Sequence, residues 1–243
     1  MEKDDIGLWS KIKEDFSLPK KNDPALYTRF EVFFNYPGVW AVVNYRVANI
    51  LYKKGFKRFA RFLSGASQIL TNIDIHPACY IGRRVFIDHG FGVVIGQTAI
   101  VNDDVLIYQG VTLGGVSLSC GKRHPTVHSF TTIGAGAKVL GDITIGKHAK
   151  IGANSVVVEN VKANCTAIGV PARVVRQKRR TKTDEISLDH NVLPDISKQM
   201  FAYLIKRVAI LEHAVKIQDN IDVSKEDEEL EKIYKNFITA MQQ

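Results

Sequence analysis

The sequence predicts a parallel β-helix with an α-helical cap before it and helices after it. Three observations predict this fold: an aliphatic residue returns every sixth position, a glycine often follows it, and the residue four positions on is small or β-branched. A period of six fits neither the roughly 3.6 residues of a helical turn nor strand hairpins, whereas three hexads make one triangular coil with the aliphatic side chains inside. The repeat positions are Ile75, Ile81, Ile87, Ile95, Val101, Ile107, Leu113, Ile133, Val139, Ile145, Ile151 and Val157.

The segment before the repeats, residues 1–72, is expected to be a helical cap, because a solenoid needs covered ends. Asp23, followed by proline, is typical of a helix start, and an apolar periodic stretch over 30–51 is interrupted at Pro37. A further helix is expected at about 56–70. The aromatic residues expected to form the packing face of the cap, rather than a ligand cage, are Phe30, Phe33, Phe34, Tyr36, Trp40 and Tyr45.

After the cap we expect a β-helix domain over 73–175, a polar linker over 176–194 and a C-terminal helical tail over 195–243. Pro171 stops the hexad pattern. Apolar spacings of three and four in the tail predict a short heptad seam between helices or symmetry mates, too short to hold an oligomer together alone. The seam positions are Phe201, Leu204, Val208, Leu211 and Val215, and a last amphipathic segment has Leu230, Ile233, Phe237 and Met241.

Composition and charge narrow the class of protein. The apolar fraction of 45% is ordinary, the first residues do not resemble a signal peptide, and no apolar run approaches the roughly 18 residues of a membrane span. We therefore expect a cytoplasmic protein without a membrane partner. The net charge of +8 includes a basic run at 178–182 that lacks aromatic residues, so we interpret it as a solvated linker. A contribution to binding an anionic cofactor is the second interpretation, and we expect no nucleic acid partner.

The three cysteines are odd in number and lack paired spacing, which predicts neither a disulfide framework nor a zinc knuckle. Cys79 falls at a repeat position that favours a small buried side chain, so packing explains it. Cys120 lies in a long break in the repeats and is expected to be an exposed thiol.

The repeat is broken twice, and both breaks contain histidine. The first break holds Asp88 and His89, and the second, over 114–132, holds Arg123 and His124. Histidine near carboxylates suits general-base chemistry because its ordinary pKa is about 6.5, and a carboxylate on its other ring nitrogen stabilises the imidazolium. An arginine offers a fork for a substrate carboxylate. Taken alone, each of these signals also fits a structural role.

Together these residues resemble the serine O-acetyltransferases, which are hexapeptide-repeat enzymes with a left-handed coil. The resemblance covers about residues 20–195, and the short cap is similar to that of the shorter bacterial members. The motifs that carry it, in order, are DIHP, FIDHGFGVVIGQTAIVNDDVLIYQGVTLGG, GKRHP, IGAGAKVLGDITIGKHAKIGANSVV and GVPAR.

The resemblance implies transfer of an acetyl group from acetyl-CoA to the hydroxyl of L-serine, which gives O-acetyl-L-serine for cysteine biosynthesis. Serine would attack the thioester directly, without an acyl-enzyme. By motif match, His89 is the general base and Asp74 is its dyad partner. The residues implied to hold serine are Asp23, Asp88, Arg123 and His124.

The resemblance also implies a homotrimer or a dimer of trimers, with sites between neighbouring subunits. No metal is expected. Glycine-rich corners would let the pantetheine arm run along backbone amides, and the basic residues would meet the phosphates. The residues predicted to bind the cofactor are Gly114, Gly115, Ala135, Gly136, Ala153, Lys150 and Arg173.

The sequence departs from the family pattern at several positions. The loop 116–120 lacks the usual Thr-Gly-Lys segment, Gln97 replaces a common Glu, and Asn154 replaces a common Gly. Members that bind O-acetylserine sulfhydrylase end in Ile, whereas this sequence ends in Gln243, so we do not expect that complex.

Three other functions stay open from the residues alone. A hexapeptide-repeat acyltransferase for an amino sugar or another small acceptor would share the coil and a histidine base. A trimeric zinc hydratase would need three histidines around one metal. A scaffold that binds partners through its tail would have no activity. The histidines available for zinc are His76, His89, His124, His128 and His148, and their spacing is not that of the hydratases.

Overall fold

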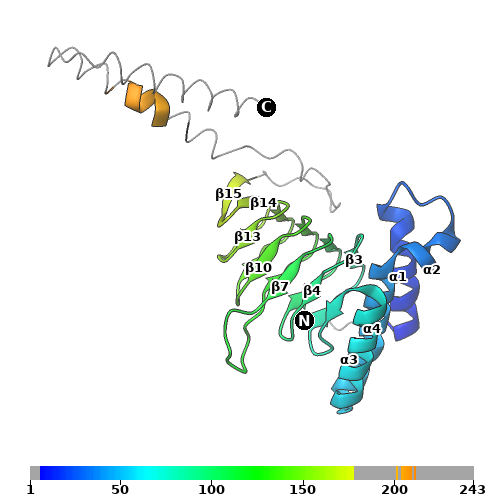
Figure 1. Ribbon diagram of the computed structural model, residues 1–243. Coiled ribbons are helices and arrows are strands. Elements are labelled where there is room, and N and C mark those ends of the chain that lie inside the picture. The colour runs from blue at the N-terminus through cyan, green and yellow to red at the C-terminus, as the bar shows by residue number, and fades with distance from the viewer. Residues whose placement is uncertain (1–5, 178–200, 202–203, 210, 212–243) are drawn as a thin grey trace, which may run out of the picture. The chain divides into compact units, whose positions relative to one another are not determined.

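The computed structural model describes residues 6–177, 201, 204–209 and 211 (Figure 1). The chain divides into two compact units, Met1–Leu193 and Pro194–Gln243. In the second unit, residues 204–209 are helical. Predicted seam residues that lie in the described part are each about half exposed, namely Phe201, Leu204, Val208 and Leu211. Val215, the last amphipathic segment and the basic run at 178–182 lie outside the described residues.

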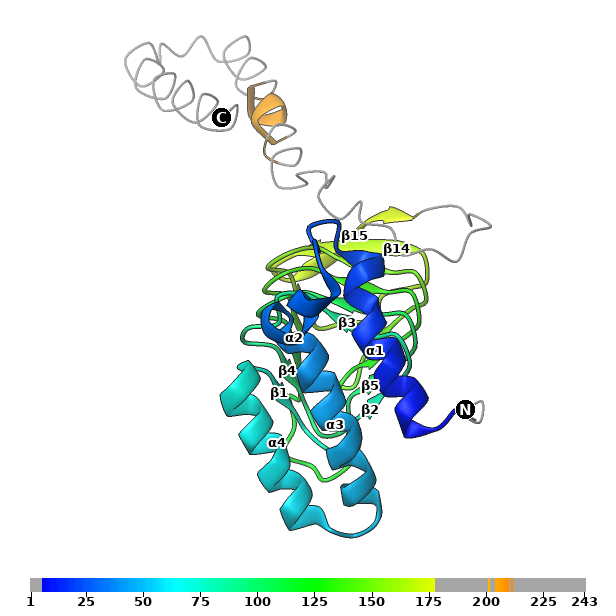
Figure 2. The same ribbon diagram turned by 90° about the vertical axis from the view of Figure 1, so that its right-hand side faces the viewer.

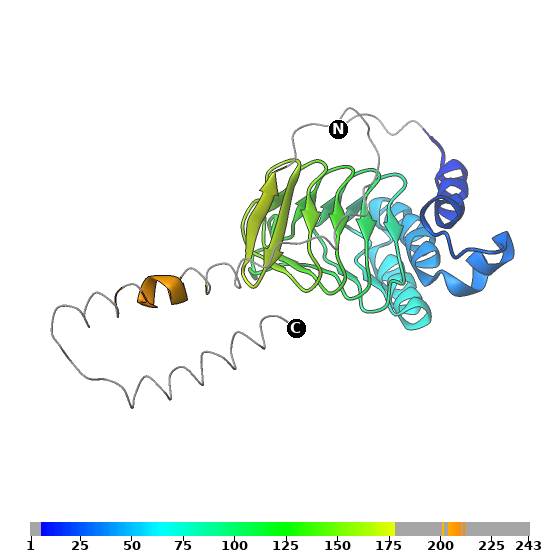
Figure 3. The same ribbon diagram turned by 90° about the horizontal axis from the view of Figure 1, so that it is seen from above.

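The repeats form a parallel β-helix whose strands gather into three faces, and its coils are seen side by side in Figure 3. The first face holds β1 (Asp74–Ile75), β4 (Val94–Ile95), β7 (Thr112–Gly114), β10 (Lys138–Leu140) and β13 (Val156–Val157). The second face holds β2 (Tyr80–Ile81), β5 (Ile100–Val101), β8 (Thr126–Val127) and β11 (Thr144–Ile145). The third face holds β3 (Phe86–Ile87), β6 (Leu106–Ile107), β9 (Thr132–Ile133), β12 (Lys150–Ile151), β14 (Cys165–Gly169) and β15 (Ala172–Gln177).

Strand register shows where the two breaks enter the coil. In a regular coil a residue pairs with the residue eighteen positions later, as Lys138 does with Val156. Across the first break the step grows to twenty, from Asp74 to Val94. Across the second it grows to twenty-six, from Thr112 to Lys138. The extra residues therefore leave the ladder at corners, and the strands on either side stay in register.

The core of the β-helix confirms the predicted repeat. All twelve repeat positions are buried, with at most 5% of their surface exposed. The pattern ends as predicted at Pro171, where β14 turns back into β15 as an antiparallel pair. Cys79 is buried and Cys120 is exposed, as expected.

Helices cover the end of the β-helix that carries β1 and β3 (Figures 1 and 2). The helical elements are α1 (Leu8–Asn22), η1 (Arg29–Glu31), α2 (Val32–Asn35), α3 (Pro37–Lys53) and α4 (Lys57–Thr71). The interruption at Pro37 and the helix near 56–70 are confirmed. The helix start expected at Asp23 is wrong, because Asp23 has an extended backbone and caps the C-terminus of α1. No helix in the described ranges is long and apolar enough to cross a membrane.

The expected packing face of aromatic residues is only partly correct. Tyr36 and Tyr45 are buried, whereas Phe30, Phe33 and Phe34 are 71%, 49% and 74% exposed. The reason is that α2 is a single turn that buries Val32 and leaves its phenylalanines outside. These rings contact one another, with centroids 5.5 Å apart for Phe30 and Phe34.

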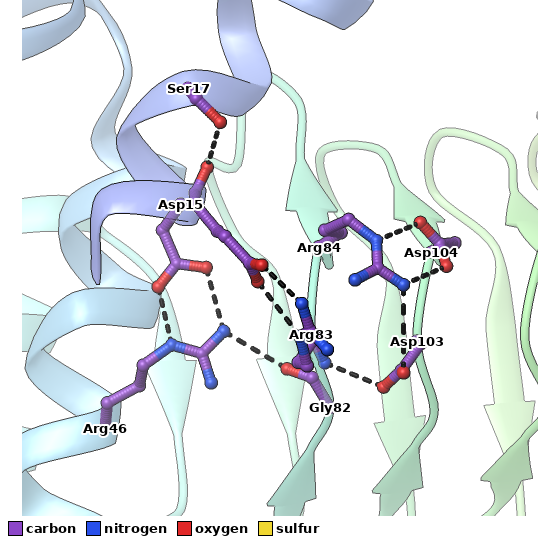
Figure 4. A network of polar contacts seen from close by, with 9 residues as sticks. Asp15, Ser17, Arg46, Gly82, Arg83, Arg84, Asp103 and Asp104 are labelled. Carbon is purple, nitrogen blue, oxygen red and sulfur yellow. Dashed lines mark hydrogen bonds and ion pairs between the residues drawn. The ribbon is translucent and has the colours of Figure 1, made fainter. Parts of the chain in front are cut away.

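A buried ion pair fastens α1 and α3 to the first coil (Figure 4). The Arg46 guanidinium donates two hydrogen bonds to the Asp15 carboxylate, at 2.5 and 2.8 Å, and a third to the carbonyl of Gly82 at 3.1 Å. The side chains of Arg46 and Asp15 are only 5% and 1% exposed. Beside this pair, the Arg83 guanidinium bonds the Glu14 carboxylate, and both side chains are more exposed.

Asp15→Asn should lower the free energy of unfolding by about 3 kcal/mol, because it leaves the buried Arg46 charge without its partner. Glu14→Gln is the matched control, and it should cost less than about 1 kcal/mol because its pair is partly solvated. Chemical denaturation of both variants measures the difference. Equal costs for the two variants would contradict the role given to the buried pair.

Candidate functional site

The two breaks lie at different corners of the β-helix. Residues 88–93 connect β3 on the third face to β4 on the first face, and we call this the first corner. Residues 115–125 connect β7 on the first face to β8 on the second face, and we call this the second corner. The first face therefore separates the two predicted groups of site residues.

His89 stands out from the first corner. Its φ of 57° lies in the left-handed region, which is uncommon for a residue other than glycine. The side chain is 69% exposed, and its Nε2 lies 3.8 Å from Oδ2 of Asp88, which is 18% exposed. Gly90 follows with a φ of 72°, where a side chain would be strained, and a Cβ there would lie 2.5 Å from Cδ1 of Ile73. The backbone thus presents an imidazole beside a carboxylate.

The helical cap adds a second carboxylate to this corner. Asp23 follows the last turn of α1, and its Oδ2 accepts a hydrogen bond from the hydroxyl of Tyr36 at 2.5 Å. Its Oδ1 accepts a hydrogen bond from the backbone N–H of Ala25 at 2.8 Å. The Tyr36 bond, then the Ala25 bond and the charge of His89 hold the pKa of Asp23 below its ordinary value.

The pKa of Asp88 is shifted in the opposite direction, upward. Burial raises its pKa, and the charge of Asp23 raises it further, whereas the charge of His89 lowers it. The two carboxylates and the imidazole are therefore close enough to influence one another. An arrangement of two carboxylates in a partly buried corner suits a cationic group such as an ammonium ion.

The second corner has the opposite electrostatic character. The guanidinium of Arg123 donates hydrogen bonds to Oε1 of Gln97 and to the carbonyl of Ser119, each at 2.8 Å. Both acceptors are neutral, so these bonds fix the orientation of the guanidinium without cancelling its charge. Such a group suits a carboxylate ligand.

Two histidines accompany this arginine. His124 is buried, and burial, then the charges of Arg123 and Lys122, lower its pKa. His76 is partly buried, and burial, then Arg61 and the two residues of the second corner, lower its pKa to about 4. Both imidazoles are therefore neutral near pH 7.

The predicted site residues do not all meet within one chain. Asp23, Asp88 and His89 meet at the first corner, whereas Arg123 and His124 meet at the second. Across the described part of the chain, no hydrogen bond or ion pair joins these two groups. Asp74 lies in β1 on the first face, and within the same ranges it forms no hydrogen bond or ion pair with His89. The dyad partner predicted for His89 thus stays a prediction.

The residues predicted for the cofactor divide between the same corners. Ala135 and Gly136 connect β9 to β10, and Ala153 connects β12 to β13. All three therefore lie on the same edge of the β-helix as the first corner, where later coils pass from the third face to the first. Gly114 ends β7, and Gly115 opens the second corner.

The two basic cofactor residues lie on the third face, Lys150 in β12 and Arg173 in β15. Nη1 of Arg173 lies 3.8 Å from Oε1 of Glu159. Neither residue is part of the two groups that hold the predicted serine ligands.

Sequence reasoning missed two polar contacts of the site. The sequence predicts a packing role for Tyr36, but a buried tyrosine usually finds a partner for its hydroxyl, and that is the available signal. Thr98 had no local signal, because its contacts with Arg123 and His124 cross the excursion of the second break.

Comparisons with known proteins give consistent matches. Residues 124–159 match the family described as bacterial transferase hexapeptide (six repeats). A serine acetyltransferase of Synechococcus elongatus is 45% identical over 205 residues, which cover 84% of this chain and 83% of that protein.

Two solved structures extend these matches. A Brucella abortus serine acetyltransferase in complex with coenzyme A has a TM-score of 0.68 and 42% identity, and covers 71% of this chain and 70% of that one. A Neisseria gonorrhoeae serine acetyltransferase in complex with serine has a TM-score of 0.67 and 37% identity, and covers 70% and 69%. The similarity therefore spans both the cap and the β-helix.

Tyr36→Phe should raise the pKa of Asp23, because the hydrogen bond that most stabilises its carboxylate is lost. Tyr27→Phe is the control, since Tyr27 is 93% exposed and should leave that pKa unchanged. Titration of the 13C-labelled aspartate carboxyls by NMR measures both variants. An unchanged Asp23 titration in Tyr36→Phe would show that the contact does not set its ionisation.

Proposed function

The chain belongs to the serine acetyltransferase family, and we propose how its two corners perform the reaction of that family. The enzyme transfers the acetyl group of acetyl-CoA to the hydroxyl of L-serine and releases O-acetyl-L-serine and CoA. An acyltransferase for another acceptor is not favoured, because the relatives that span most of the chain are serine acetyltransferases. The observation that carries the proposal is that two carboxylates lie at one corner and an arginine lies at the other, where its bonds within the described residues go to neutral acceptors. These two groups match the two ends of an amino acid.

Serine is bound through its two charged groups. Asp23 and Asp88 attract the ammonium group, and the hydrogen bonds to Asp23 keep that carboxylate ionised. Arg123 binds the carboxylate, since its protein partners leave its charge available. His124 adds a contact to the same end of serine.

One copy of the chain supplies only half of this site. We propose a homotrimer in which the first corner of one copy faces the second corner of the next. We also propose that the β-helix of each copy is left-handed, as in the repeat class. The pantetheine arm of acetyl-CoA then runs between the glycine and alanine residues of the two corners, and Lys150 and Arg173 are the candidates to meet its phosphates. Association into a pair of trimers, the cytoplasmic location and the lack of a sulfhydrylase complex stay predictions.

His89 acts as the general base. It takes the proton from the serine hydroxyl as the oxygen attacks the thioester carbonyl, the carbon–sulfur bond breaks, and the proton passes to the departing CoA sulfur. Asp74 is the proposed partner that steadies the imidazolium. General-base catalysis contributes roughly 10²- to 10⁴-fold, so the alignment of the two substrates and hydrogen bonds to the oxyanion supply the rest.

The acceptor assignment is tested by thiol release from acetyl-CoA with L-serine, homoserine, threonine and glucosamine. We expect the three amino acids to be better acceptors than glucosamine, because the two corners recognise an ammonium and a carboxylate group together, and L-serine to be the best of the three, as the family indicates. Activity with the sugar alone would overturn the assignment. A lack of thiol release with every acceptor would favour a scaffold without activity.

His89→Ala should lower kcat by about 10²-fold or more, because the general base is removed. His148→Ala is a matched control: His148 has a similar positive φ of 58° but lies between β11 and β12, away from both corners. Steady-state kinetics with saturating serine measure both variants. Activity of His89→Ala equal to that of the control would mean that another group is the base.

A further inference from the structure

We propose that Thr98 is a positioning residue that holds His124 in the neutral tautomer with its hydrogen on Nε2, so that His124 donates a hydrogen bond to the substrate carboxylate. The tautomer follows from the hydrogen bonds around Thr98. The role toward the carboxylate rests on the proposed function.

The hydroxyl of Thr98 donates its hydrogen to His124. Its Oγ1 accepts the backbone N–H of Arg123 at 3.0 Å and the backbone N–H of His124 at 3.2 Å. A hydroxyl has two acceptor lone pairs and one hydrogen, so both lone pairs are occupied. The remaining contact of Oγ1, with Nδ1 of His124 at 2.8 Å, must therefore use the hydroxyl hydrogen.

A second donor reaches the same ring nitrogen. The backbone N–H of Thr98 donates to Nδ1 of His124 at 3.3 Å. A backbone N–H can only donate, so Nδ1 presents its lone pair and carries no hydrogen. In a neutral imidazole the hydrogen then resides on Nε2.

The surroundings keep this imidazole neutral. Burial is the largest cause that lowers the pKa of His124, and the charges of Arg123 and Lys122 add to it. A proton added to Nδ1 would also face the hydroxyl and the N–H that now donate to it. The neighbouring His76 is itself neutral near pH 7, because its pKa is about 4.

The other edge of the ring lies on glycine. A Cβ at Gly96 would be 2.1 Å from Nε2, and a Cβ at Gly115 would be 3.2 Å from it. The Nε2–H edge therefore lies over the turns that lead from β4 and β7 to the second face, and a larger residue at position 96 would displace it. Arg123, the neighbour of His124 in sequence, brings a second donor for an anionic oxygen to the same corner.

The direct test is the 15N NMR spectrum of histidine-labelled enzyme, which distinguishes the two neutral tautomers. His124→Asn assigns the signal among the seven histidines. We expect hydrogen on Nε2 of His124 in the wild type and in Thr98→Ser, which keeps the hydroxyl. Thr98→Val has a similar shape without the hydroxyl. It loses the shorter donor to Nδ1, at 2.8 Å, and keeps only the backbone N–H at 3.3 Å, so it should give a mixture of tautomers. Hydrogen on Nδ1 in the wild type would overturn the proposal.

Kinetics test the role of the donor. Thr98→Val should raise the KM for serine about tenfold, the loss of one hydrogen bond to a charged group, with a smaller change in kcat and in the KM for acetyl-CoA. Thr98→Ser should restore the serine KM. A wild-type serine KM in Thr98→Val, or a loss confined to kcat, would overturn the assignment to the carboxylate.

These outcomes are separate from a failure of the proposed function. The tautomer is read without turnover, and serine acetylation by the wild type is measured alongside. If Thr98→Val does not fold, the wild-type spectrum still decides the tautomer.

Discussion

The geometry of the site depends on the buried pair of Arg46 and Asp15. This pair joins two helices of the cap to each other, and the bond from Arg46 to the carbonyl of Gly82 joins both to the first coil. Removing two charges from water costs free energy that offsets much of their attraction. A buried pair therefore adds little to the free energy of unfolding, and its main contribution is to fix how the elements are oriented. Here it fixes the direction of α1, whose C-terminus places Asp23 beside the first corner.

The β-helix supplies the second constraint. A regular coil has eighteen residues, and a closely packed core tolerates little adjustment, so extra residues can leave only at corners. The two breaks use different corners, one with a net negative group and one with a net positive group. A single chain therefore presents two halves that suit opposite ends of one amino acid.

Periodicity was sufficient to predict the coil and its buried residues, because every repeat position has the same environment. The helix start at Asp23 was predicted wrongly, since the local signal of Asp before Pro is the same at the end of α1 as at a helix start. The roles of Tyr36 and Thr98 depend on hydrogen bonds to residues far away in the sequence. Tyr36 bonds Asp23, 13 positions earlier, and Thr98 contacts His124, 26 positions later. Such contacts depend on how the cap packs and on the register of the coils, and no local sequence pattern predicts either.

The central claim is that the two corners of neighbouring copies form one site. Co-expression of His89→Ala and Arg123→Ala subunits, each with a different tag, followed by purification on both tags, tests it most directly. In a mixed trimer one of the three sites receives both intact corners, so we expect about a third of the wild-type activity, while each variant alone is severely impaired. Mixed trimers no more active than the two variants alone would contradict the account.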